Sequence, residues 1–286
     1  VVDAPRLPHF GETLRGDAVD YRFGGKGGNQ AVAAARMGAR VAMAGRVGRD
    51  AAGTNIRAAL ASAGVDQTRV LDTDGATGMS VAITERTGDY GAVIVSAANL
   101  STDGAGPVPE DCSVCLIQNE VPEDANLALA RTLPDSCTLV LNAAPARALP
   151  ETLAKRVDVL VVNQGEAVEL GGTQSPEAAA TRLLELGVGS VIVTLGADGL
   201  MIADRNGALH HPARRVSVVS THGAGDMFVG ALAAELARGA AMTTAARFAQ
   251  DAAALWISAP IAARTKITEV EVRALGRSAP AGQISP

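Results

Sequence analysis

The segment Ser220-Thr221-His222-Gly223-Ala224-Gly225-Asp226-Met227-Phe228 places two glycines and a carboxylate where a helix is expected to begin. After it, Phe228, Leu232 and Leu236 recur at every fourth position, and Gly239 follows as a helix C-cap would. A glycine-rich turn entering a helix offers free backbone N–H groups and the positive end of the helix dipole. Because both features suit a phosphate, the segment indicates an anion-binding site.

Asp226 is an unexpected residue at such a site, because its carboxylate would repel an anion. The segment alone leaves two interpretations open. Asp226 is either a simple N-cap of the helix or the base that takes a proton from a hydroxyl attacking the bound phosphate.

A second glycine-rich segment, Phe23-Gly24-Gly25-Lys26-Gly27-Gly28-Asn29-Gln30, runs into strong helix formers at residues 31–36. Its glycines let the backbone approach a small ligand, and Lys26 and Asn29 offer charged and amide groups for hydroxyls. It is not a GxxxxGK[ST] phosphate loop, because the Lys comes too early and no Ser or Thr follows it. Taken alone, it could equally be a flexible loop before a core helix.

Together the two segments resemble the two signatures of the ribokinase-like (PfkB) family of carbohydrate kinases. Between about residues 8 and 256 further motifs match in the family's order: Thr77-Gly78-Met79-Ser80-Val81, Gln118-Asn119-Glu120, Leu141-Asn142-Ala143-Ala144-Pro145-Ala146-Arg147, Asn163-Gln164-Gly165-Glu166 and Thr194-Leu195-Gly196-Ala197-Asp198-Gly199. A set of motifs in register is far more specific than any one of them. The resemblance implies ATP-dependent phosphorylation of a sugar primary hydroxyl, with a ribose-like pentose as the substrate.

The resemblance also implies a role for each matched residue. Asp226 would be the base on the sugar hydroxyl, and the N–H groups of Gly223, Ala224, Gly225 and Asp226 would form an anion hole for the transferring phosphoryl group. The residues implied to bind the sugar are Gly24, Gly25, Lys26, Asn29, Ser80 and Glu120. Those implied to bind ATP are Asn163, Thr194, Gly196 and Gly199. Asn163 and Glu166 would organise Mg²⁺ through water.

Plain structural alternatives stay open for several of these residues. Glu166 could be a solvated helix residue, Asn163 an N-cap and Gly199 a turn. His222 lies beside the anion hole, but its position varies in the family, which argues against a catalytic role. Two other functions also remain: a family kinase of a nucleoside or keto-sugar acid, and a homologue that binds sugar or nucleotide without turnover. Retention of Asp226 argues against the second.

Two features depart from the family's pattern. The family opens with a strand ending in a sugar-binding Asn-x-Asp, which would lie upstream of Val1-Val2-Asp3. We expect the sequence to begin after it, because losing an inner strand would expose apolar surface and unpaired backbone groups. Ser220 stands where relatives usually carry an Asp that helps hold a monovalent cation, and the later loop over residues 257–263 is also changed. These changes predict a weak response to K⁺.

Composition limits the possible functions. Of the 286 residues, 48% are hydrophobic but only 2% aromatic, so the core must rest on Ala, Val and Leu. A net charge of −5 and the lack of a basic run argue against nucleic acid as a partner. No apolar run reaches membrane-spanning length, and no charged and apolar leader pattern is present, although the sequence starts at Val1 and a removed leader stays open.

The three cysteines favour a reducing compartment, and we expect a cytoplasmic location. Cys112 and Cys115 form a lone C-x-x-C within a predicted buried strand, without a second pair or a nearby His to complete a metal site. A core role is therefore expected for both, and for Cys137.

Strand and helix patterns alternate along the chain. We predict strands over residues 41–44, 112–118, 138–141, 157–162 and 190–194, and helices over residues 53–63, 124–133, 164–170, 176–186 and 224–238. Such alternation predicts an α/β fold, a mostly parallel sheet sandwiched by helices.

Two segments, about 1–23 and 69–95, break this alternation and carry turns at Asp74-Gly75 and Gly88-Asp89. In the family the corresponding strands form a small β lid over the sugar and often a dimer contact, so a homodimer through the lid is implied. We expect residues 1–277 to form a single domain and residues 278–286 to be a disordered tail.

Overall fold

A six-stranded, mostly parallel sheet forms the body of the protein. The computed structural model describes residues 1–85, 90–104, 106 and 108–277. In this sheet β7 (Val114–Gln118), β8 (Thr138–Asn142), β9 (Val159–Asn163) and β10 (Ser190–Thr194) run parallel. The hairpin β11 (Leu200–Asp204) and β12 (Gly207–His211) extends the sheet antiparallel beyond β10.

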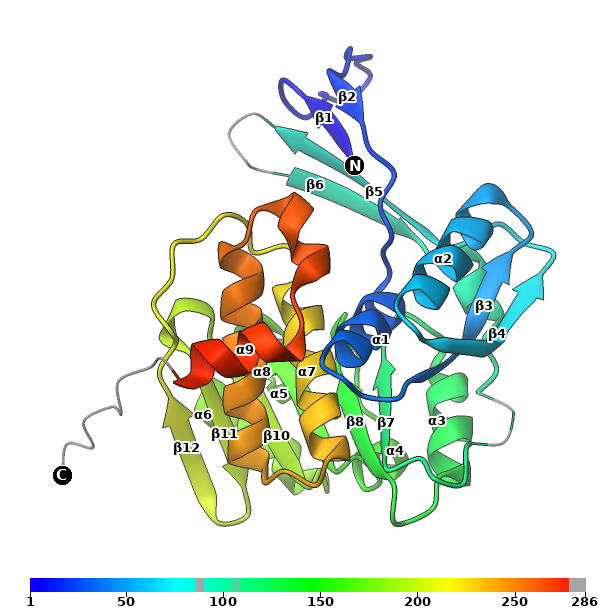
Figure 1. The fold of residues 1–286 in the computed structure, drawn as a ribbon. Coiled ribbons are helices and arrows are strands. Elements are labelled where there is room, and N and C mark those ends of the chain that lie inside the picture. The colour runs from blue at the N-terminus through cyan, green and yellow to red at the C-terminus, as the bar shows by residue number, and fades with distance from the viewer. Residues whose placement is uncertain (86–89, 105, 107, 278–286) are drawn as a thin grey trace.

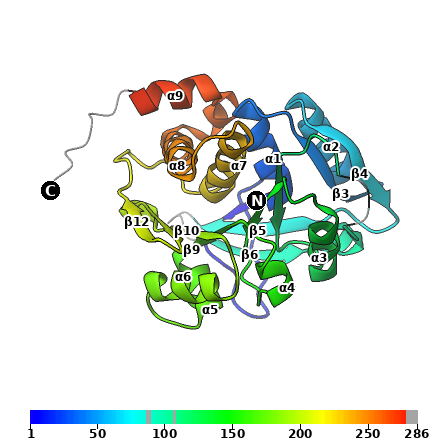
Figure 2. The same cartoon turned by 90° about the horizontal axis from the view of Figure 1, so that it is seen from below.

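Both faces of this sheet are buried, as expected of a parallel sheet. Val159 and Val161 point into one apolar core, whereas Leu160 and Val162 between them point into the other. Figure 2 shows the sheet between two layers of helices. One layer holds α1 (Lys26–Arg36), α7 (Ala224–Ala237), α8 (Met242–Ser258) and α9 (Glu269–Arg277), and the other holds α3 (Glu123–Thr132), α4 (Glu151–Ala154), α5 (Gln164–Gly171) and α6 (Pro176–Glu185). The predicted fold class is confirmed.

A second sheet projects from this body (Figure 1). It contains β2 (Ala18–Val19), β1 (Val2–Ala4), β5 (Met79–Glu85) and β6 (Tyr90–Val95) in that order, and we call it the lid sheet. Thr77 lies just before β5, where the lid sheet joins the body. The N–H and the hydroxyl of Thr77 both donate to the Asp50 carboxylate, which also caps α2 (Ala51–Ser62). The hydrogen bonds from Thr77 and from the helix N–H of Gly53 hold the pKa of Asp50 at about 2.

The expected lid segment differs from the observed one in part. Residues 69–73 belong to β4 (Asp66–Thr73), which pairs in parallel with β3 (Ala42–Gly48) in a separate two-stranded sheet. The turn predicted at Gly88-Asp89 and the tail predicted over residues 278–286 lie outside the described residues. Within the part that is described, no helix combines the length and apolarity needed to cross a bilayer.

Helix α1 begins earlier than the sequence suggested. Its first residue is Lys26, so Gly27, Gly28 and Asn29 lie inside the helix rather than in a loop. A contact distant in sequence explains the early start: the Glu120 carboxylate accepts the N–H of Lys26 at 2.7 Å. This bond satisfies one of the donors that a helix start leaves unpaired, and it compensates for poor helix formers.

The three cysteines lie in or beside the core, as predicted. Cys137 is fully buried and packs with Leu139 and Leu141, while Cys115 is partly buried beside the same cluster. Burial raises the pKa of both thiols to about 12. Cys112 lies 3.7 Å from Cys137, sulfur to sulfur, so it neighbours a core thiol rather than a metal-ligand set.

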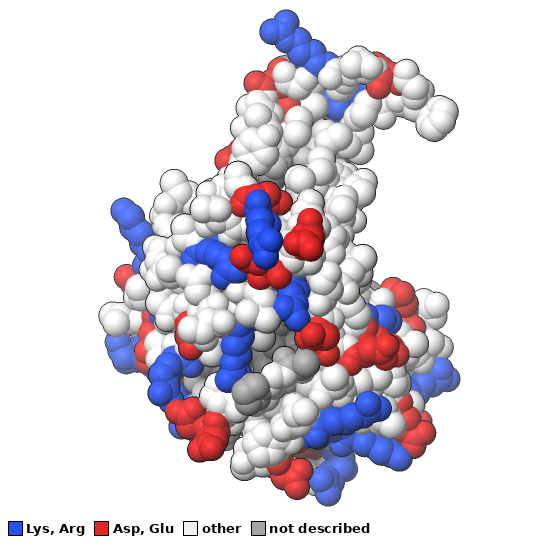
Figure 3. Space-filling model, turned by 90° about the vertical axis from the view of Figure 1, so that its right-hand side faces the viewer, with Lys and Arg blue, Asp and Glu red and all other residues white. Residues whose placement is uncertain are grey.

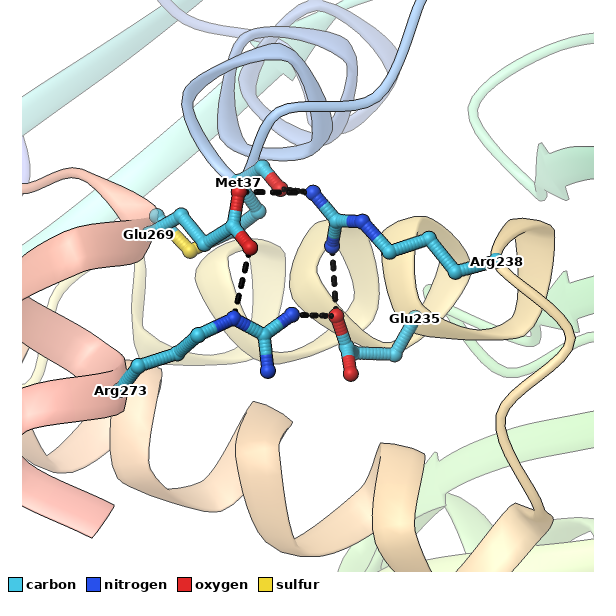
Figure 4. Close-up of polar contacts among 5 residues, drawn as sticks. All are labelled: Met37, Glu235, Arg238, Glu269 and Arg273. Carbon is cyan, nitrogen blue, oxygen red and sulfur yellow. Dashed lines mark hydrogen bonds and ion pairs between the residues drawn. The ribbon is translucent and has the colours of Figure 1, made fainter. Parts of the chain in front are cut away.

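A buried carboxylate joins the far end of α7 to α9 and α1 (Figure 4). The side chain of Glu235 is 5% exposed, and its Oε1 lies 2.5 Å from both Arg238 Nη1 and Arg273 Nη2. Arg238 also donates to the carbonyl of Met37 at the end of α1, and Glu269 bridges the two arginines. The network fixes α9 and the end of α1 against α7.

We expect Glu235→Gln to lower the free energy of unfolding by about 1–3 kcal/mol, because two charge-assisted hydrogen bonds to arginine are weakened in a buried place. The control is Glu151→Gln, which removes an exposed ion pair with Lys155 and should change stability by less than about 0.5 kcal/mol. Urea unfolding of both variants measures the difference. Equal effects would show that the network contributes no more than a surface pair.

Candidate active site

Polar side chains end the four parallel strands at one edge of the sheet. Gln118 ends β7 opposite Asn142 of β8, and Asn163 ends β9 opposite Thr194 of β10. The carboxyl ends of parallel strands are where α/β sheets bind ligands, because the strands stop there and the helices begin. The first turns of α1 and α7 meet this edge, so both glycine-rich segments converge on it.

Helices α1 and α7 approach unusually closely, and Gly230 permits it. A Cβ at Gly230 would lie 2.6 Å from both the Gln30 carbonyl oxygen and the Cβ of Ala33. Gly230 is one turn from Asp226 on α7, so the contact brings the start of α1 against the Asp226 side chain.

Asp226 is held by two amides of α1. Its Oδ2 accepts from Asn29 Nδ2 at 2.8 Å, and its Oδ1 accepts from Gln30 Nε2 at 3.0 Å. The N-cap of α7 is Gly223, and the helix has no side-chain cap, so the interpretation of Asp226 as a simple N-cap is wrong. Burial raises the pKa of Asp226, while Asn29, Lys26, Gln30 and His222 act in the opposite direction.

A chain of buried amides supports this carboxylate. Gln30 is fully buried, and its Nε2 also donates to Asn142 Oδ1 at 2.9 Å. Gln118 donates to Gln30 Oε1 at 2.6 Å, and Asn142 donates to the Val161 carbonyl at 3.1 Å. Sequence reasoning gave Gln30, Gln118 and Asn142 no role. The signal for Gln118 and Asn142 was a polar residue at the end of a predicted buried strand, whereas Gln30, inside α1, gave none.

The start of α7 has the form of an anion site. Gly223 adopts φ 78, a left-handed conformation that favours glycine, and a Cβ there would lie in tight contact with Trp256 Nε1, at 3.2 Å. The N–H of Ala224, which the sequence placed in the anion hole, already donates to the Thr221 carbonyl at 3.1 Å. It is therefore not available to an anion. Among the residues that the structure describes, Gly225 and Asp226 donate to no backbone carbonyl before the helix, so their N–H groups are available for a ligand.

Glu120 is fixed at the same edge of the sheet. Besides accepting the Lys26 N–H, it sits in a segment clamped by Arg147, which donates to Val121 O at 2.9 Å and Asn119 Oδ1 at 3.1 Å. Gly25 lies beside the carboxylate, since its Cβ would be 4.0 Å from Glu120 Oε2, and Gly24 precedes it on the surface.

Ser80 is placed differently from the other residues implied to bind sugar. It lies in β5 of the lid sheet, paired with Ile94, and shares no hydrogen bond with Glu120, Lys26 or Asn29.

Asn163 and Glu166 form a capping box at the start of α5. Asn163 Oδ1 accepts the Glu166 N–H and Glu166 Oε2 accepts the Asn163 N–H, each at 2.8 Å. This is the N-cap alternative that the sequence left open, yet it leaves Glu166 Oε1 outside the box. Burial raises the pKa of Glu166, and its bond from Asn163 and the charge of Lys26 oppose the rise. The charge of Lys26 lowers the pKa of both Asp226 and Glu166.

The remaining residues implied to bind ATP follow β10. Thr194 Oγ1 donates to the Val162 carbonyl at 3.4 Å, and Gly196 begins a short 3₁₀ turn, η2 (Gly196–Asp198). Gly199 has a structural reason to be glycine, since its φ is 99 and a Cβ would lie 2.0 Å from the His211 carbonyl oxygen. These residues lie on the β9–β10 side of the edge, while Asp226, Asn29 and Glu120 lie nearer β7 and β8.

Comparisons with known proteins agree with this arrangement. Residues 2–268 match the pfkB family carbohydrate kinase model. The chain is 32% identical over 272 residues to the ribokinase of Haemophilus influenzae, covering 90% of this chain and 88% of that protein. It is 34% identical over 241 residues to the deoxyribokinase of Salmonella typhi, covering 80% and 79%. Among solved structures, Arabidopsis thaliana ribokinase complexed with ribose and ATP superposes with a TM-score of 0.87 at 28% identity, covering 96% and 94%.

The chain therefore belongs to the pfkB family of carbohydrate kinases and is a phosphotransferase.

We predict that Gln30→Met moves the acid limb of the pH profile of kcat/KM to higher pH. A hydrogen bond to a carboxylate favours its charged form, so losing the Gln30 donor raises the pKa of Asp226, and activity is recovered at alkaline pH. Gln118→Met is the matched control, because it removes an amide that contacts Gln30 but not Asp226. A profile that shifts equally in both variants would mean that Gln30 acts through packing.

Proposed function

We propose that the protein is an ATP-dependent kinase that phosphorylates the primary hydroxyl of ribose or a closely related pentose. The observation that carries the proposal is Asp226, a carboxylate held by two amides in the first turn of a helix. The first N–H groups of a helix are available to bind an anion. The relatives named ribokinase and deoxyribokinase support a pentose as the acceptor. The solved relative that binds ribose and ATP supports the same pair of substrates.

In this proposal Asp226 takes the proton from the sugar hydroxyl. The freed oxygen forms a bond to the γ-phosphorus of ATP, the bond from that phosphorus to the bridging oxygen breaks, and ADP leaves. Asn29 and Gln30 orient the carboxylate, and the N–H groups of Gly225 and Asp226 stabilise charge on the transferring group. Asp226 then releases its proton to solvent.

Sugar binding is assigned to the other groups at the same edge. Glu120, fixed by the Lys26 N–H and the Arg147 clamp, presents a carboxylate to sugar hydroxyls beside Gly24, Gly25 and Asn29. The Lys26 side chain supplies a positive charge that acts on both Asp226 and Glu166. We assign Ser80 to the sugar as well, on the lid sheet, and Asn163, Thr194, Gly196 and Gly199 to ATP.

The residues near Glu166 fit a Mg²⁺ ion bound mainly by phosphate and water. Among the described residues no group of three or more His, Cys, Asp or Glu side chains could form an all-protein site. Glu166 Oε1 lies outside the capping box and, with Asn163, would reach the ion through water. When bound, Mg²⁺ neutralises charge on the phosphates. The site uses ATP, which favours a cytoplasmic location.

The substrate is tested by ADP release over ribose, deoxyribose, hexoses, nucleosides and keto-sugar acids. Ribose or deoxyribose should give the highest kcat/KM. A preference for a nucleoside or keto-sugar acid would support the second interpretation. ADP from no acceptor, together with thermal shifts on adding sugar or ATP, would show that the chain binds without turnover.

We expect Asp226→Asn to lower kcat by at least about 10² to 10⁴ while ATP and sugar affinities stay within several-fold. The melting temperature should stay equal or rise. Because folding raises the pKa of Asp226, the carboxyl group stabilises the fold only below its unfolded pKa, and this contribution is lost as pH rises through the folded pKa. A neutral amide therefore removes a penalty at neutral pH. Retention of most turnover would exclude Asp226 as the base.

Glu166→Gln should raise the Mg²⁺ concentration needed for half-maximal rate several-fold without unfolding the protein, because Gln can still complete the capping box. Glu185→Gln is the control, because Glu185 is an exposed carboxylate at the end of α6, just before the start of β10 and away from the carboxyl edge of the sheet. Metal titrations of both variants decide. A normal titration for Glu166→Gln would remove this residue from the metal site.

We also propose a homodimer formed through the lid sheet. The pairs Met79–Val95 and Val81–Val93 place four apolar side chains on one face of β5 and β6, and these are 42–66% exposed. On the side drawn in Figure 3, the projecting sheet carries few charged side chains compared with the body. Contact of this face with a second copy of the chain would bury the apolar side chains.

Val81→Glu should convert the dimer to a monomer, since a charge would be buried in the contact. Light scattering after size exclusion measures the mass of both forms. A monomeric wild type at all concentrations would contradict the proposed dimer.

A further inference from the structure

Arg264 is a buried cation beside the start of α7. It lies in a 3₁₀ helix, η3 (Ile261–Lys266), that follows α8, and only 4% of its surface is exposed. Its Nη2 donates to the Ser220 carbonyl at 2.6 Å, its Nη1 to the His222 carbonyl at 3.0 Å and its Nε to the Ala259 carbonyl at 3.4 Å. No Asp or Glu among the described residues forms an ion pair with it.

This surrounding is unusual for a buried charge. Buried guanidinium groups normally pair with carboxylates, whereas here only carbonyl dipoles and an aromatic face compensate the charge. The guanidinium carbon lies 5.2 Å from the centre of the Trp256 ring, over its face. Burial lowers the pKa of Arg264 from its very high ordinary value, yet the group stays charged at neutral pH.

The carbonyls that accept from Arg264 lie next to the N–H donors of the anion site at the start of α7. With Gly223 as the N-cap, the Asp226 N–H is one of the donors that a helix start leaves unpaired. If α7 began one residue earlier, the His222 carbonyl would accept this N–H. Here that carbonyl accepts instead from Arg264 and, at 2.8 Å, from Trp256 Nε1. It is thereby kept from the Asp226 N–H, which remains available for a phosphoryl oxygen. The same Trp256 ring lies beside Gly223, the N-cap of α7.

We propose that Arg264 is a positioning residue and a built-in cation for phosphoryl transfer. It fixes the carbonyls of Ser220 and His222, holds the N–H groups at the start of α7 open for the phosphate and adds a fixed positive charge beside them. A dissociable monovalent cation would need the same carbonyl oxygens, which the guanidinium already occupies. The enzyme should therefore work without K⁺, as the Ser220 substitution also predicts. This inference rests on the proposed kinase function.

Thermal unfolding tests the cation site without turnover. Wild type, Arg264→Ala and Arg273→Ala are melted in Na⁺, K⁺ and methylguanidinium chloride at matched ionic strength. Arg273 is the control, because it also lies over a ring, 4.8 Å from the centre of Phe248, but pairs with Glu235 and Glu269 at the far end of α7. Wild type should melt within about 1 °C in Na⁺ and K⁺ and gain nothing from methylguanidinium, whereas Arg264→Ala should gain several degrees. Arg273→Ala should gain as well, because it leaves Glu235 and Glu269 without that guanidinium, so the control separates the two sites by rate rather than by melting.

Kinetics with the best sugar test the consequence for catalysis. Wild-type kcat/KM should differ less than about threefold between Na⁺ and K⁺. Arg264→Ala should lose at least about tenfold in kcat while KM for the sugar changes less than about threefold, and methylguanidinium should restore at least about threefold of the rate. Arg273→Ala should show no cation-specific rescue.

Several results would overturn the proposal. These are a kcat for Arg264→Ala within about twofold of wild type, no methylguanidinium effect on either melting or rate, and activation of wild type by K⁺ of about tenfold or more. If Arg264→Ala does not fold, Arg264→Lys keeps the charge without the planar fork and should fold with a reduced kcat. Full activity of Arg264→Lys would then overturn it. If the wild type phosphorylates no sugar, the proposed function is wrong. The melting experiment needs no turnover and still tests the role of Arg264.

Discussion

The close contact of α1 with α7 at Gly230 is the constraint on which the site depends. The two helices come from opposite ends of the chain, and only a residue without a side chain lets the backbone of Gln30 lie this near to α7. The contact places Asn29 and Gln30 on the Asp226 carboxylate. It also closes the edge of the sheet where β7 and β8 present Gln118 and Asn142. The amide chain then passes from strand to helix to carboxylate without a break.

Several ionisable side chains around this contact are buried or partly buried. Burial works against the ionised forms of Asp226 and Glu166, and amides, backbone N–H groups and Lys26 offset it. A base near a developing negative charge needs such a compromise, because a fully stabilised carboxylate would be a weak proton acceptor. Arg264, beside the residues that precede α7, is a buried cation compensated by carbonyls rather than by acids. At the far end of the same helix Glu235 anchors α9 (Figure 4).

Much of the fold could be predicted from the sequence, because buried strands and amphipathic helices alternate with clear periods. The hairpin β11–β12 and the helices α8 and α9 were not predicted. β11 has a buried pattern, but β12 (Gly-Ala-Leu-His-His) is exposed and shows no alternation, and α8 is so rich in alanine that its apolar face is hard to distinguish. The early start of α1 depends on Glu120, which lies 94 residues away, and no local pattern reports such a partner.

The candidate site was predictable as residue types but not as geometry. Asp226, Glu120 and Asn29 converge as their motifs implied, whereas Gln30 and Arg264 gave no signal, since a lone amide or arginine in an apolar segment has no characteristic spacing. The capping box of Asn163 and Glu166 shows the opposite case. One short motif satisfies both a local structural role and a proposed metal role, and only titration separates them.

Replacement of Gly230 by alanine, compared with the same change at Gly171, tests the central claim most directly. In both places the added Cβ would lie 2.6 Å from the facing helix, but Gly171 packs against Ala179 of α6, away from Asp226. We predict that Gly230→Ala lowers kcat/KM by at least about tenfold more than Gly171→Ala when both are measured well below their melting temperatures. Equal activity of the two folded variants would contradict the account, because Asp226 would then be positioned without the α1–α7 contact.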